Sequence, residues 1–264
     1  MKLPMKQPQT YIAPLLLALV LFFSIAAQAQ TTIKVMAYPF PPFFNEDNRT
    51  GLTTDLIALL NTLQSDYRFE LRPTSPMRRY QQFATQRADM VFFEMPQWGW
   101  DTSALGFETT REIMHGGEKY ITAKVAGRGQ EYFNDIKSKS ISAYIGYHYG
   151  FADFNANPDW LRKHFTIGLH HSHERIIDLV LKNKVEIGVV TLSYLKQYLH
   201  ANPQVRSKLL ISENFDQKFH LRMLVRKDGP IDVATFEQLL DRLKENNQLR
   251  ALFIANGLED LLIY

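Results

Sequence analysis

The stretch that decides the fold covers residues 32–63 and reads "TIKVMAYPFPPFFNEDNRTGLTTDLIALLNTL". It opens with a β-branched and apolar run, TIKVMAY, which predicts a short strand. The segment YPFPPFF (residues 38–44) ends this strand, because proline cannot donate a hydrogen bond to a central β-ladder. Leucines then recur at helical spacing over residues 52–63, with Thr53 or Thr54 placed to cap the helix. The stretch therefore predicts a strand, a stiff aromatic loop and a helix.

The same alternation of strands and helices continues along the chain. YRFELRP (residues 67–73) predicts a second strand, and Ser75 with Pro76 predicts a helix start whose helix runs to about Gln86. ADMVFFEM (residues 88–95) predicts a third strand. A second set of strands and helices is predicted over residues 140–147, 160–164, 165–169, 174–182 and 185–190.

Alternating strands and helices predict parallel sheets covered by helices, and two such sets predict two lobes. The strands YITAKVAGR (residues 120–128) and HLRMLVRKDGP (residues 220–230) are expected to cross between the lobes as a two-strand hinge. Helical spacing over residues 235–256 then predicts a return to the first lobe. The predicted boundaries are residues 1–29 for an export signal, 30–120 and 222–264 for lobe 1, and 121–221 for lobe 2.

The N-terminus has the pattern of a secretory signal. Lys2 and Lys6 precede an apolar run over residues 15–27, and small residues stand at Ala27 and Ala29. This run is shorter than the roughly 20 residues that span a bilayer. We therefore expect cleavage after Ala29 and a soluble exported protein, with an uncleaved N-terminal anchor as the alternative.

The amino-acid composition indicates the cellular compartment and limits the classes of partner. The chain contains no cysteine, which favours the bacterial periplasm over the disulfide-rich eukaryotic exterior. Removal of the two lysines of the signal lowers the formal net charge from +3 to +1, so nothing favours nucleic acid or an anionic membrane as a partner. No phosphate-binding loop, nucleophile elbow or zinc-protease motif occurs in the sequence. We expect a monomer without a cofactor.

Several motifs, in this order, resemble the periplasmic solute-binding proteins of the polar amino acid type, known as family 3. YPFPPFF and GLTTDL (residues 51–56) stand where that family has a Tyr-Pro-Pro-Phe-like segment and a helix beginning near Gly-Phe-Asp-x-Asp-Leu. PMRR (residues 76–79) resembles its Pro-Trp-x-Arg, and RAD (residues 87–89) its turn into the third strand. IGYHYGF (residues 145–151) is similar to the Gly-Tyr-x-Tyr-Gly of one branch. The resemblance covers essentially the whole mature chain.

The resemblance implies a fold and a function. The implied fold is the two-lobe type II periplasmic-binding-protein fold, in which each lobe is a mixed, mostly parallel sheet flanked by helices. The implied function is capture of a small polar or aromatic solute, an amino acid or a derivative, by hinge closure. The bound form would be passed to an inner-membrane ABC permease or to a sensor.

The chain departs from the family at both ends of the usual amino-acid clamp. The family's Thr-x-x-Arg, whose arginine holds the ligand carboxylate, falls on EMPQWGWD, with Trp98 near the threonine and Asp101 near the arginine. The family's aspartate for the ligand ammonium falls on Thr191. A simple α-amino acid bound in the usual way is therefore not expected.

Loops that follow parallel strands line clefts in α/β sheets, so aromatic and polar residues on these loops are the candidate ligand contacts. Arg79 is the candidate for an anion contact, because its charge is unfavourable in the first turn of a helix. Glu94 could accept a hydrogen bond from a ligand amine. The predicted ligand-binding residues are Tyr38, Phe40, Phe43, Arg79, Glu94, Trp98, Tyr147 and Thr191.

Three other interpretations of the sequence are open. Zinc could be bound by His170, His171 and His173. We favour an interpretation without a metal ion, because these residues lie at a loop-to-helix junction and no acid stands at a recognised spacing from them. Periplasmic cyclohexadienyl dehydratases resemble the same family, so an enzyme that uses Glu94 or Glu186 as the acid is the alternative to a non-catalytic binder. The third interpretation is a degenerate solute-binding protein that serves only in interactions with other molecules.

Overall fold

The computed structural model describes residues 1, 4, 30–47, 49–100 and 105–264. The chain divides into Met1–Gln30 and a compact unit, Thr31–Tyr264, whose fold is described below. The predicted signal and its cleavage site therefore lie outside the described residues, except for residues 1 and 4. Within the described residues, no helix combines the length and apolarity needed to cross a membrane.

The core of the compact unit is a sheet whose strand order is β2-β1-β3-β9-β5-β8-β6-β7, with β4 also paired to β9. Strand β1 runs parallel to β2 and β3, and β6 runs parallel to β7 and β8. Strand β9 is antiparallel to both β3 and β5, so β5 and β9 connect a β1 side (β1, β2, β3) to a β8 side (β6, β7, β8). The strands are β1 (Thr31–Ala37), β2 (Tyr67–Pro73), β3 (Met90–Glu94), β4 (Phe107–Thr109), β5 (Met114–Ala123), β6 (Ile141–Tyr144), β7 (Ile167–His170), β8 (Ile187–Thr191) and β9 (Leu209–Arg226).

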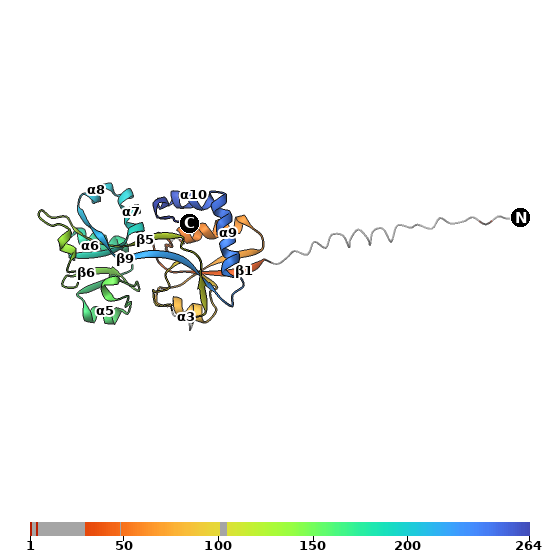
Figure 1. The fold of residues 1–264 in the computed structure, drawn as a ribbon, viewed down its shortest axis with the longest axis horizontal. Helices are drawn as coiled ribbons and strands as arrows, with labels where there is room; N and C mark the ends of the chain where they lie inside the picture. The colour runs from red at the N-terminus through yellow and green to blue at the C-terminus, as the bar shows by residue number, and fades with distance from the viewer. Residues whose placement is uncertain (2–3, 5–29, 48, 101–104) are drawn as a thin grey trace. The chain divides into compact units, whose positions relative to one another are not determined.

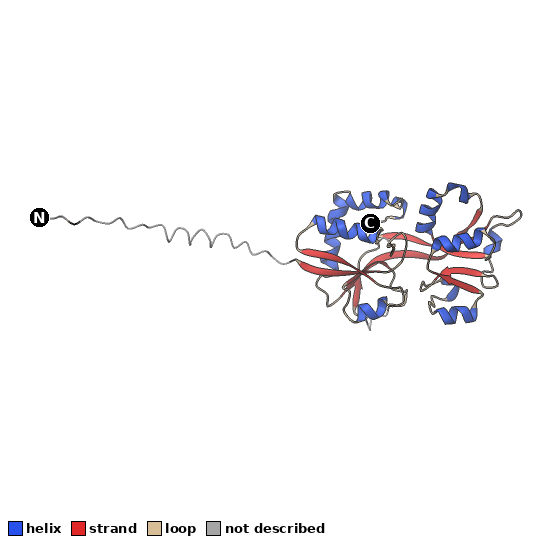
Figure 2. Ribbon diagram, turned by 180° about the vertical axis from the view of Figure 1, so that it is seen from behind, coloured by secondary structure: helices blue, strands red, loops and turns tan. Residues whose placement is uncertain are grey.

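Helices cover both faces of the sheet. Figure 1 shows α9 and α10 above the sheet and α3 below it, and Figure 2 shows the same layers from behind. Helices α9 and α10 both pack against α2. The helices are α2 (Leu52–Leu63), α3 (Arg79–Ala84), α5 (Pro158–His164), α6 (His173–Leu181), α7 (Leu192–Ala201), α8 (Pro203–Arg206), α9 (Val233–Glu245) and α10 (Gln248–Ala255), with 3₁₀ turns η1 (Gln130–Phe133), η2 (Gly150–Ala152) and η3 (Glu259–Leu261).

The aromatic loop after β1 caps α2 with its own carbonyl groups. The backbone N–H of Leu52 donates to the Pro42 carbonyl at 3.2 Å, and that of Thr53 donates to the Phe43 carbonyl at 2.9 Å. Gly51 is required between them, because its φ is +124° and a Cβ there would lie 2.6 Å from the Pro42 oxygen. The predicted cap by Thr53 or Thr54 is therefore wrong, since loop carbonyls already satisfy these donors.

One predicted helix has different limits in the structure. The helix expected from Ser75 begins only at Arg79, because the Pro76 carbonyl accepts a hydrogen bond from the Arg79 side chain at 2.7 Å and residues 76–78 form a turn. The helical pattern expected over residues 235–256 forms the two helices α9 and α10, which meet at Asn247, where φ is +56°, in the left-handed region. Helix α7, which follows β8 directly, was not predicted.

The predicted lobe boundaries stay a prediction. They fall within β5, between residues 120 and 121, and within β9, between residues 221 and 222. These are the two strands that connect the β1 side to the β8 side.

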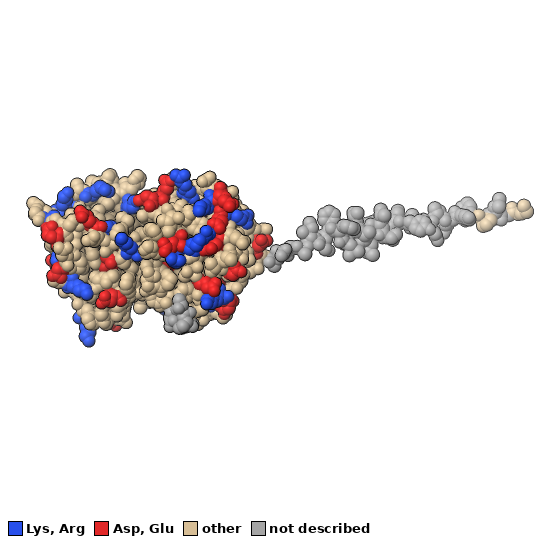
Figure 3. Space-filling view, viewed as in Figure 1, with Lys and Arg blue, Asp and Glu red and all other residues tan. Residues whose placement is uncertain are grey.

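On the face shown in Figure 3, basic and acidic side chains are interspersed.

Candidate ligand-binding cavity

Loops at the carboxyl ends of parallel strands meet around one small cavity. The loops after β1, β3 and β6 all contribute to it, as does the central pair of strands, β5 and β9. Its volume is about 10 Å³, close to the roughly 10–15 Å³ that one water molecule needs. The lining residues are Tyr38, Phe40, Arg79, Trp98, Glu118, Gly146, Tyr147, His148, Gln217 and Phe219.

The structure brings most of the predicted residues to this cavity. Three predicted residues are not part of its lining. Glu94 lies next to it, bonded to Tyr38, whereas Phe43 packs against Phe40 and Phe93. Thr191 lies at the end of β8 and its hydroxyl is 3.5 Å from the Pro41 carbonyl. The predicted residues that line the cavity are Tyr38, Phe40, Arg79, Trp98 and Tyr147.

Phe40 is at the centre of an aromatic wall. Its ring centroid lies 5.4 Å from that of Tyr147, 5.8 Å from that of Trp98 and 6.1 Å from that of Phe219, all in edge-to-face contact. The Tyr147 hydroxyl also donates to the Pro39 carbonyl at 3.1 Å. The loop after β1 therefore contacts Trp98, which follows a strand of the β1 side, and Tyr147, which follows a strand of the β8 side. The rings of this loop fill the space between the two sides.

A buried ion pair lies behind this wall. Arg79, 1% exposed, has its Nε 3.8 Å from Oε2 of Glu94, which is 0% exposed. The Tyr38 hydroxyl donates to the same carboxylate oxygen at 2.9 Å, and the guanidinium carbon lies 4.6 Å from the Tyr38 ring centroid. Burial raises the pKa of Glu94, and the charge of Arg79 and the Tyr38 hydrogen bond oppose that rise. The two groups therefore compensate each other by charge, while Nε of Arg79 and Oε1 of Glu94 have no hydrogen-bond partner among the described residues.

A bulge in β3 precedes Glu94. The pairing with β9 passes from Val91 opposite Leu224 to Glu94 opposite Arg222, so β3 contains one extra residue. Phe93, within this irregularity, has φ +57°, in the left-handed region, which costs roughly 1–2 kcal/mol for a residue with a side chain. Bulges of this kind redirect side chains next to sites. The sequence gives no signal of this bulge.

His148 joins the ion pair to the loop after β3. Its Nδ1 lies 3.3 Å from Nη2 of Arg79, and its Nε2 lies 3.3 Å from the Tyr80 hydroxyl. Burial, and then the charge of Arg79, lower the pKa of His148 to about 3, so the ring is neutral at physiological pH. A neutral ring can accept from Arg79 through Nδ1, while the Tyr80 hydroxyl donates onward to the Trp98 carbonyl at 2.5 Å.

A second polar chain leads from the aromatic wall to Glu118. The indole Nε1 of Trp98 donates to Oε1 of Gln217 at 2.9 Å. The Gln217 amide nitrogen donates to Oε2 of Glu118 at 2.9 Å and also to the His148 carbonyl. Gln217 therefore fixes Trp98 and Glu118 in one network at the cavity.

Glu118 is a buried acid without a cationic partner. It is 1% exposed, and among the described residues no donor reaches its Oε1 and no cation forms an ion pair with it. Burial raises the pKa of Glu118 well above its ordinary value, Asp216 adds to this rise, and the Gln217 hydrogen bond opposes it. In the β5–β8 pair Glu118 stands directly opposite Thr191. Glu118 therefore lies on the strand next to the predicted ligand contact Thr191.

The charged groups next to Glu118 are engaged elsewhere. The Lys119 ammonium donates to the Glu213 carbonyl at 2.6 Å and lies 3.6 Å from the Phe215 ring centroid. The Asp216 carboxylate accepts from the Tyr120 hydroxyl at 2.5 Å and from two backbone N–H groups of the turn at residues 150–151. Lys119 therefore does not compensate the charge of Glu118, and Asp216 is itself an acid, which adds to the rise in the pKa of Glu118.

Gly146 allows the two sides to approach at the cavity. Its φ is +80°, and a Cβ added there would lie 2.8 Å from the Pro76 Cβ. Pro76 precedes α3 on the β1 side, whereas Gly146 follows β6 on the β8 side. Only glycine fits this contact without a shift of the backbone.

The remaining predicted positions lie away from the cavity. His173 is buried against the rings of Tyr144 and Tyr194, with centroids 5.0 Å away in each case, and burial lowers its pKa to about 3. Among the described residues, the donor atoms of His170, His171 and His173 do not converge as a metal site. The Glu186 carboxylate accepts from Ser140, and this backbone hydrogen bond lowers its pKa. Asp101 lies outside the described residues.

Two groups of cavity-lining residues were not predicted from the sequence. Gly146 and His148 lie inside the IGYHYGF motif, so that motif offered a signal for them. Glu118, Gln217 and Phe219 lie within long strands, where only pairing between distant strands shows which face they occupy.

Comparison with known proteins gives the fold and no closer relative. No protein-family model matches the chain, and no curated protein matches it in sequence. An ABC uptake transporter substrate-binding protein from Streptococcus pneumoniae, with bound histidine, matches at TM-score 0.68 and 15% identity over 88% of this chain and 95% of that one. A putative ABC transporter binding component from Wolinella succinogenes, complexed with lysine, matches at TM-score 0.64 and 14% identity over 85% of this chain and 95% of that one. The GluR0 ligand-binding core from Nostoc punctiforme, in complex with L-glutamate, matches at TM-score 0.61 and 15% identity over 84% of this chain and 97% of that one.

These structural matches confirm the predicted fold class. The chain has the type II periplasmic-binding-protein fold, a mixed α/β architecture in which mostly parallel sets of strands are joined by two central strands. At 14–15% identity the likeness concerns the fold.

Proposed function

We propose that this protein is an exported solute-binding protein, a divergent member of family 3, that encloses a small organic cation. The observation that carries the proposal is Glu118, a carboxyl group that lines the cavity and has no cationic partner among the described residues. The fold, shared with proteins that hold amino acids, supports a binding role.

The cavity chemistry fits an ammonium or guanidinium group. A buried carboxylate is costly unless a cation compensates it, and a ligand cation would supply a charge-assisted hydrogen bond to the free Oε1 of Glu118. The aromatic wall of Phe40, Trp98 and Phe219 offers ring faces to a cation and an apolar surface to its carbon skeleton.

Among the described residues, the cavity offers a ligand carboxylate no cation without a counter-charge. Arg79 is the only described lysine or arginine in its lining; its Nη atoms contact the Pro76 carbonyl and His148, and its Nε, which has no hydrogen-bond partner, lies 3.8 Å from the Glu94 carboxylate. We therefore propose an amine or guanidine that lacks a carboxylate, in place of the amino acids held by the similar structures. In this proposal Arg79 positions the site and is not the anion contact.

Binding requires the two sides to separate and close again. A cavity of about 10 Å³ admits no organic solute, so entry would require opening about the central strands β5 and β9. Residues 1–29 would direct export to the periplasm, and the closed, loaded form would be passed to an ABC permease or a sensor.

Matched ligand pairs test the proposal in a thermal-shift screen. The pairs putrescine and ornithine, agmatine and arginine, and 2-phenylethylamine and phenylalanine each differ by one carboxylate. A ligand at 100 times its Kd stabilises the protein by about 2.7 kcal/mol, which raises Tm by roughly 5–10 °C for a chain of this size. We expect shifts with amines only. Shifts with the amino acids alone would contradict the ligand class, and no shift with any compound would contradict the binding function.

The enzyme alternative needs an acid at the solute. Among the described residues, Glu118 is the only acidic one in the lining, whereas Glu94 lies next to the cavity and Glu186 lies away from it. Mass spectrometry of a bound amine after prolonged incubation separates the two functions. Recovery of the amine unchanged supports a binder, and a product lighter by one water or one ammonia would indicate a lyase.

A further inference from the structure

A cluster of metal-ligating side chains lies outside the cavity, on the two central strands. His115 in β5 stands directly opposite His220 in β9, and their ring centroids are 4.8 Å apart. Glu112 lies just before β5 and hydrogen-bonds to both rings. Neither the cavity nor the proposed solute-binding function uses these three residues.

The donor atoms have the spacing of a metal site. Oε2 of Glu112 lies 3.0 Å from Nε2 of His115 and 3.2 Å from Nδ1 of His220. All three donor atoms lie within 4.8 Å of one another. Two tetrahedral ligands at zinc bond lengths of about 2.0–2.1 Å lie roughly 3.3 Å apart. An ion therefore fits between these atoms after small movements of the side chains.

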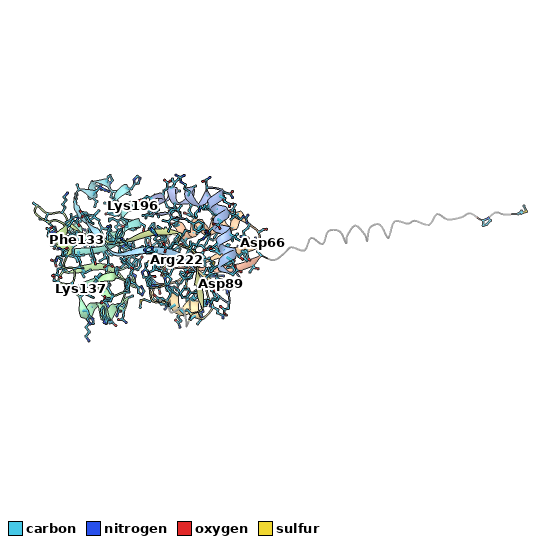
Figure 4. All side chains as sticks on the ribbon, in the orientation of Figure 1. Asp66, Asp89, Phe133, Lys137, Lys196 and Arg222 are labelled. Carbon is cyan, nitrogen blue, oxygen red and sulfur yellow. The ribbon has the colours of Figure 1, made fainter. Side chains whose placement is uncertain are left out.

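Arg222 orients the carboxylate of this cluster. Its Nη2 lies 2.6 Å from Oε1 of Glu112, and its Nη1 donates to the Thr110 carbonyl at 3.2 Å. Figure 4 labels Arg222, which belongs to β9. Because Arg222 occupies Oε1, Oε2 remains directed at the two imidazoles, as outer-shell partners direct the ligands of metal sites.

The donor set selects the class of ion. Two imidazoles and one carboxylate suit zinc and neighbouring transition metals, whereas calcium and magnesium prefer oxygen ligands. Each imidazole side chain is 49% exposed, so an ion can enter from solvent. Three protein ligands would leave the remaining coordination position to water.

We propose that Glu112, His115 and His220 bind a divalent transition-metal ion of the zinc class. The ion replaces the two imidazole protons that face Oε2 of Glu112. It bridges β5 and β9, the strands that connect the two sides of the sheet. The proposal does not depend on the solute-binding function.

Cobalt titration of untagged protein, stripped with EDTA and dialysed, tests the proposal. We expect one Co²⁺ per chain, with visible absorption bands of a low-coordinate site that zinc abolishes by competition. His115→Ala and His220→Ala should each weaken binding by more than the 10- to 100-fold typical of an outer-shell loss, and Glu112→Gln should also weaken it. His200→Ala, at an exposed position of α7, is the matched control and should bind like the unaltered protein.

Three outcomes would overturn the proposal. The first is the absence of saturable binding in the unaltered protein, and the second is undiminished binding in a His115→Ala, His220→Ala double variant. The third is loss of the cobalt bands in a His170→Ala, His171→Ala double variant, which would move the site to the other histidine cluster. Metal-free thermal unfolding of every variant shows that its fold is intact before binding is compared.

Discussion

Two buried glutamates border the cavity, and they differ in what surrounds them. Glu94 is 0% exposed and Glu118 is 1% exposed, and burial is the main cause that raises the pKa of both. Glu94, at the end of β3, has a guanidinium 3.8 Å away and a tyrosine hydroxyl 2.9 Å away. Glu118, in β5, has one amide donor and, among the described residues, no ion-pair partner. Oε1 of each carboxylate lacks a hydrogen-bond donor among the described residues, so the two acids differ in charge compensation: Glu94 has a cation beside it and Glu118 has none.

The difference separates a structural from a functional role. A buried charge whose partner lies in the same chain needs nothing from a ligand. A buried acid without such a partner lowers stability, and this cost is common where a ligand later supplies the missing group. We therefore assign Glu94 to the fold and Glu118 to the ligand, and the following predictions test this division.

The largest effect is expected for Arg79→Met, which leaves Glu94 without its cation. Loss of one partner of a buried ion pair costs about 3–5 kcal/mol, so urea denaturation at pH 7 should show a reduction of this size in the free energy of unfolding. Adding Glu94→Gln to Arg79→Met should restore most of the loss. Because Nε of Arg79 lies beyond hydrogen-bonding distance of Glu94, a loss below about 1 kcal/mol would show that other contacts support Glu94.

Glu118→Gln should remove binding of the amine and leave the fold intact. Truncating one partner of a buried charge pair in a complex costs about 2–5 kcal/mol, which corresponds to a roughly 30- to 5,000-fold increase in Kd by isothermal titration calorimetry. The matched control is Glu213→Gln, because Glu213 is an exposed acid in β9. Equal affinity in the Glu118→Gln and Glu213→Gln proteins would remove Glu118 from the site.

The pH dependence follows from the raised pKa of Glu118. Below that pKa the carboxyl group of the unliganded protein holds its proton, and a cationic ligand requires the carboxylate, so binding should release a proton. Affinity should therefore rise by up to about tenfold per pH unit below that pKa. His148 does not interfere between pH 6 and 8, because its pKa is about 3. Calorimetry in phosphate and in Tris measures the released proton, and equal heats in the two buffers would contradict the mechanism.

Stability should show the opposite pH trend. The folded-state pKa of Glu118 is raised above its unfolded value, so the folded protein binds the proton more tightly. Its stability contribution is fully present below the unfolded pKa and is lost as pH rises through the folded pKa. Glu118→Gln cannot lose a proton, so its Tm should exceed that of the unaltered protein increasingly as the pH rises. A constant difference in Tm between pH 5 and 8 would contradict a pKa of Glu118 that is raised well above its unfolded value.

The sequence was sufficient where local pattern determines structure. The spacing of Leu52, Leu56 and Leu60 predicts α2, and all three side chains are buried. The prolines of the loop after β1 predict the end of that strand, and Arg79 stands in the first turn of α3 as expected. The carboxyl ends of parallel strands then bring Tyr38 and Trp98 to one cavity.

The sequence was insufficient where pairing between distant strands determines structure. Glu118 faces the Thr191 position only because β5 and β8 pair in one register, at a separation of 73 positions along the chain. The bulge at Phe93 likewise depends on pairing with β9. Loop carbonyls at Pro42 and Phe43 cap α2 in place of a side chain, and no side-chain pattern reveals this.

The smallest effect is expected for Tyr147→Phe, which removes one hydrogen bond between the sides of the sheet. The Tyr147 hydroxyl donates to the Pro39 carbonyl at 3.1 Å, so its loss should cost about 0.5–1.5 kcal/mol. Tyr132→Phe is the control, because the Tyr132 hydroxyl donates to Glu186 at the surface. If the hydrogen bond of Tyr147 holds the closed form, the same free energy appears in binding, as a roughly 2- to 12-fold rise in the Kd of the amine. A stability loss with an unchanged Kd would assign Tyr147 to the fold alone, together with Glu94, and would leave Glu118 as the residue that governs ligand binding.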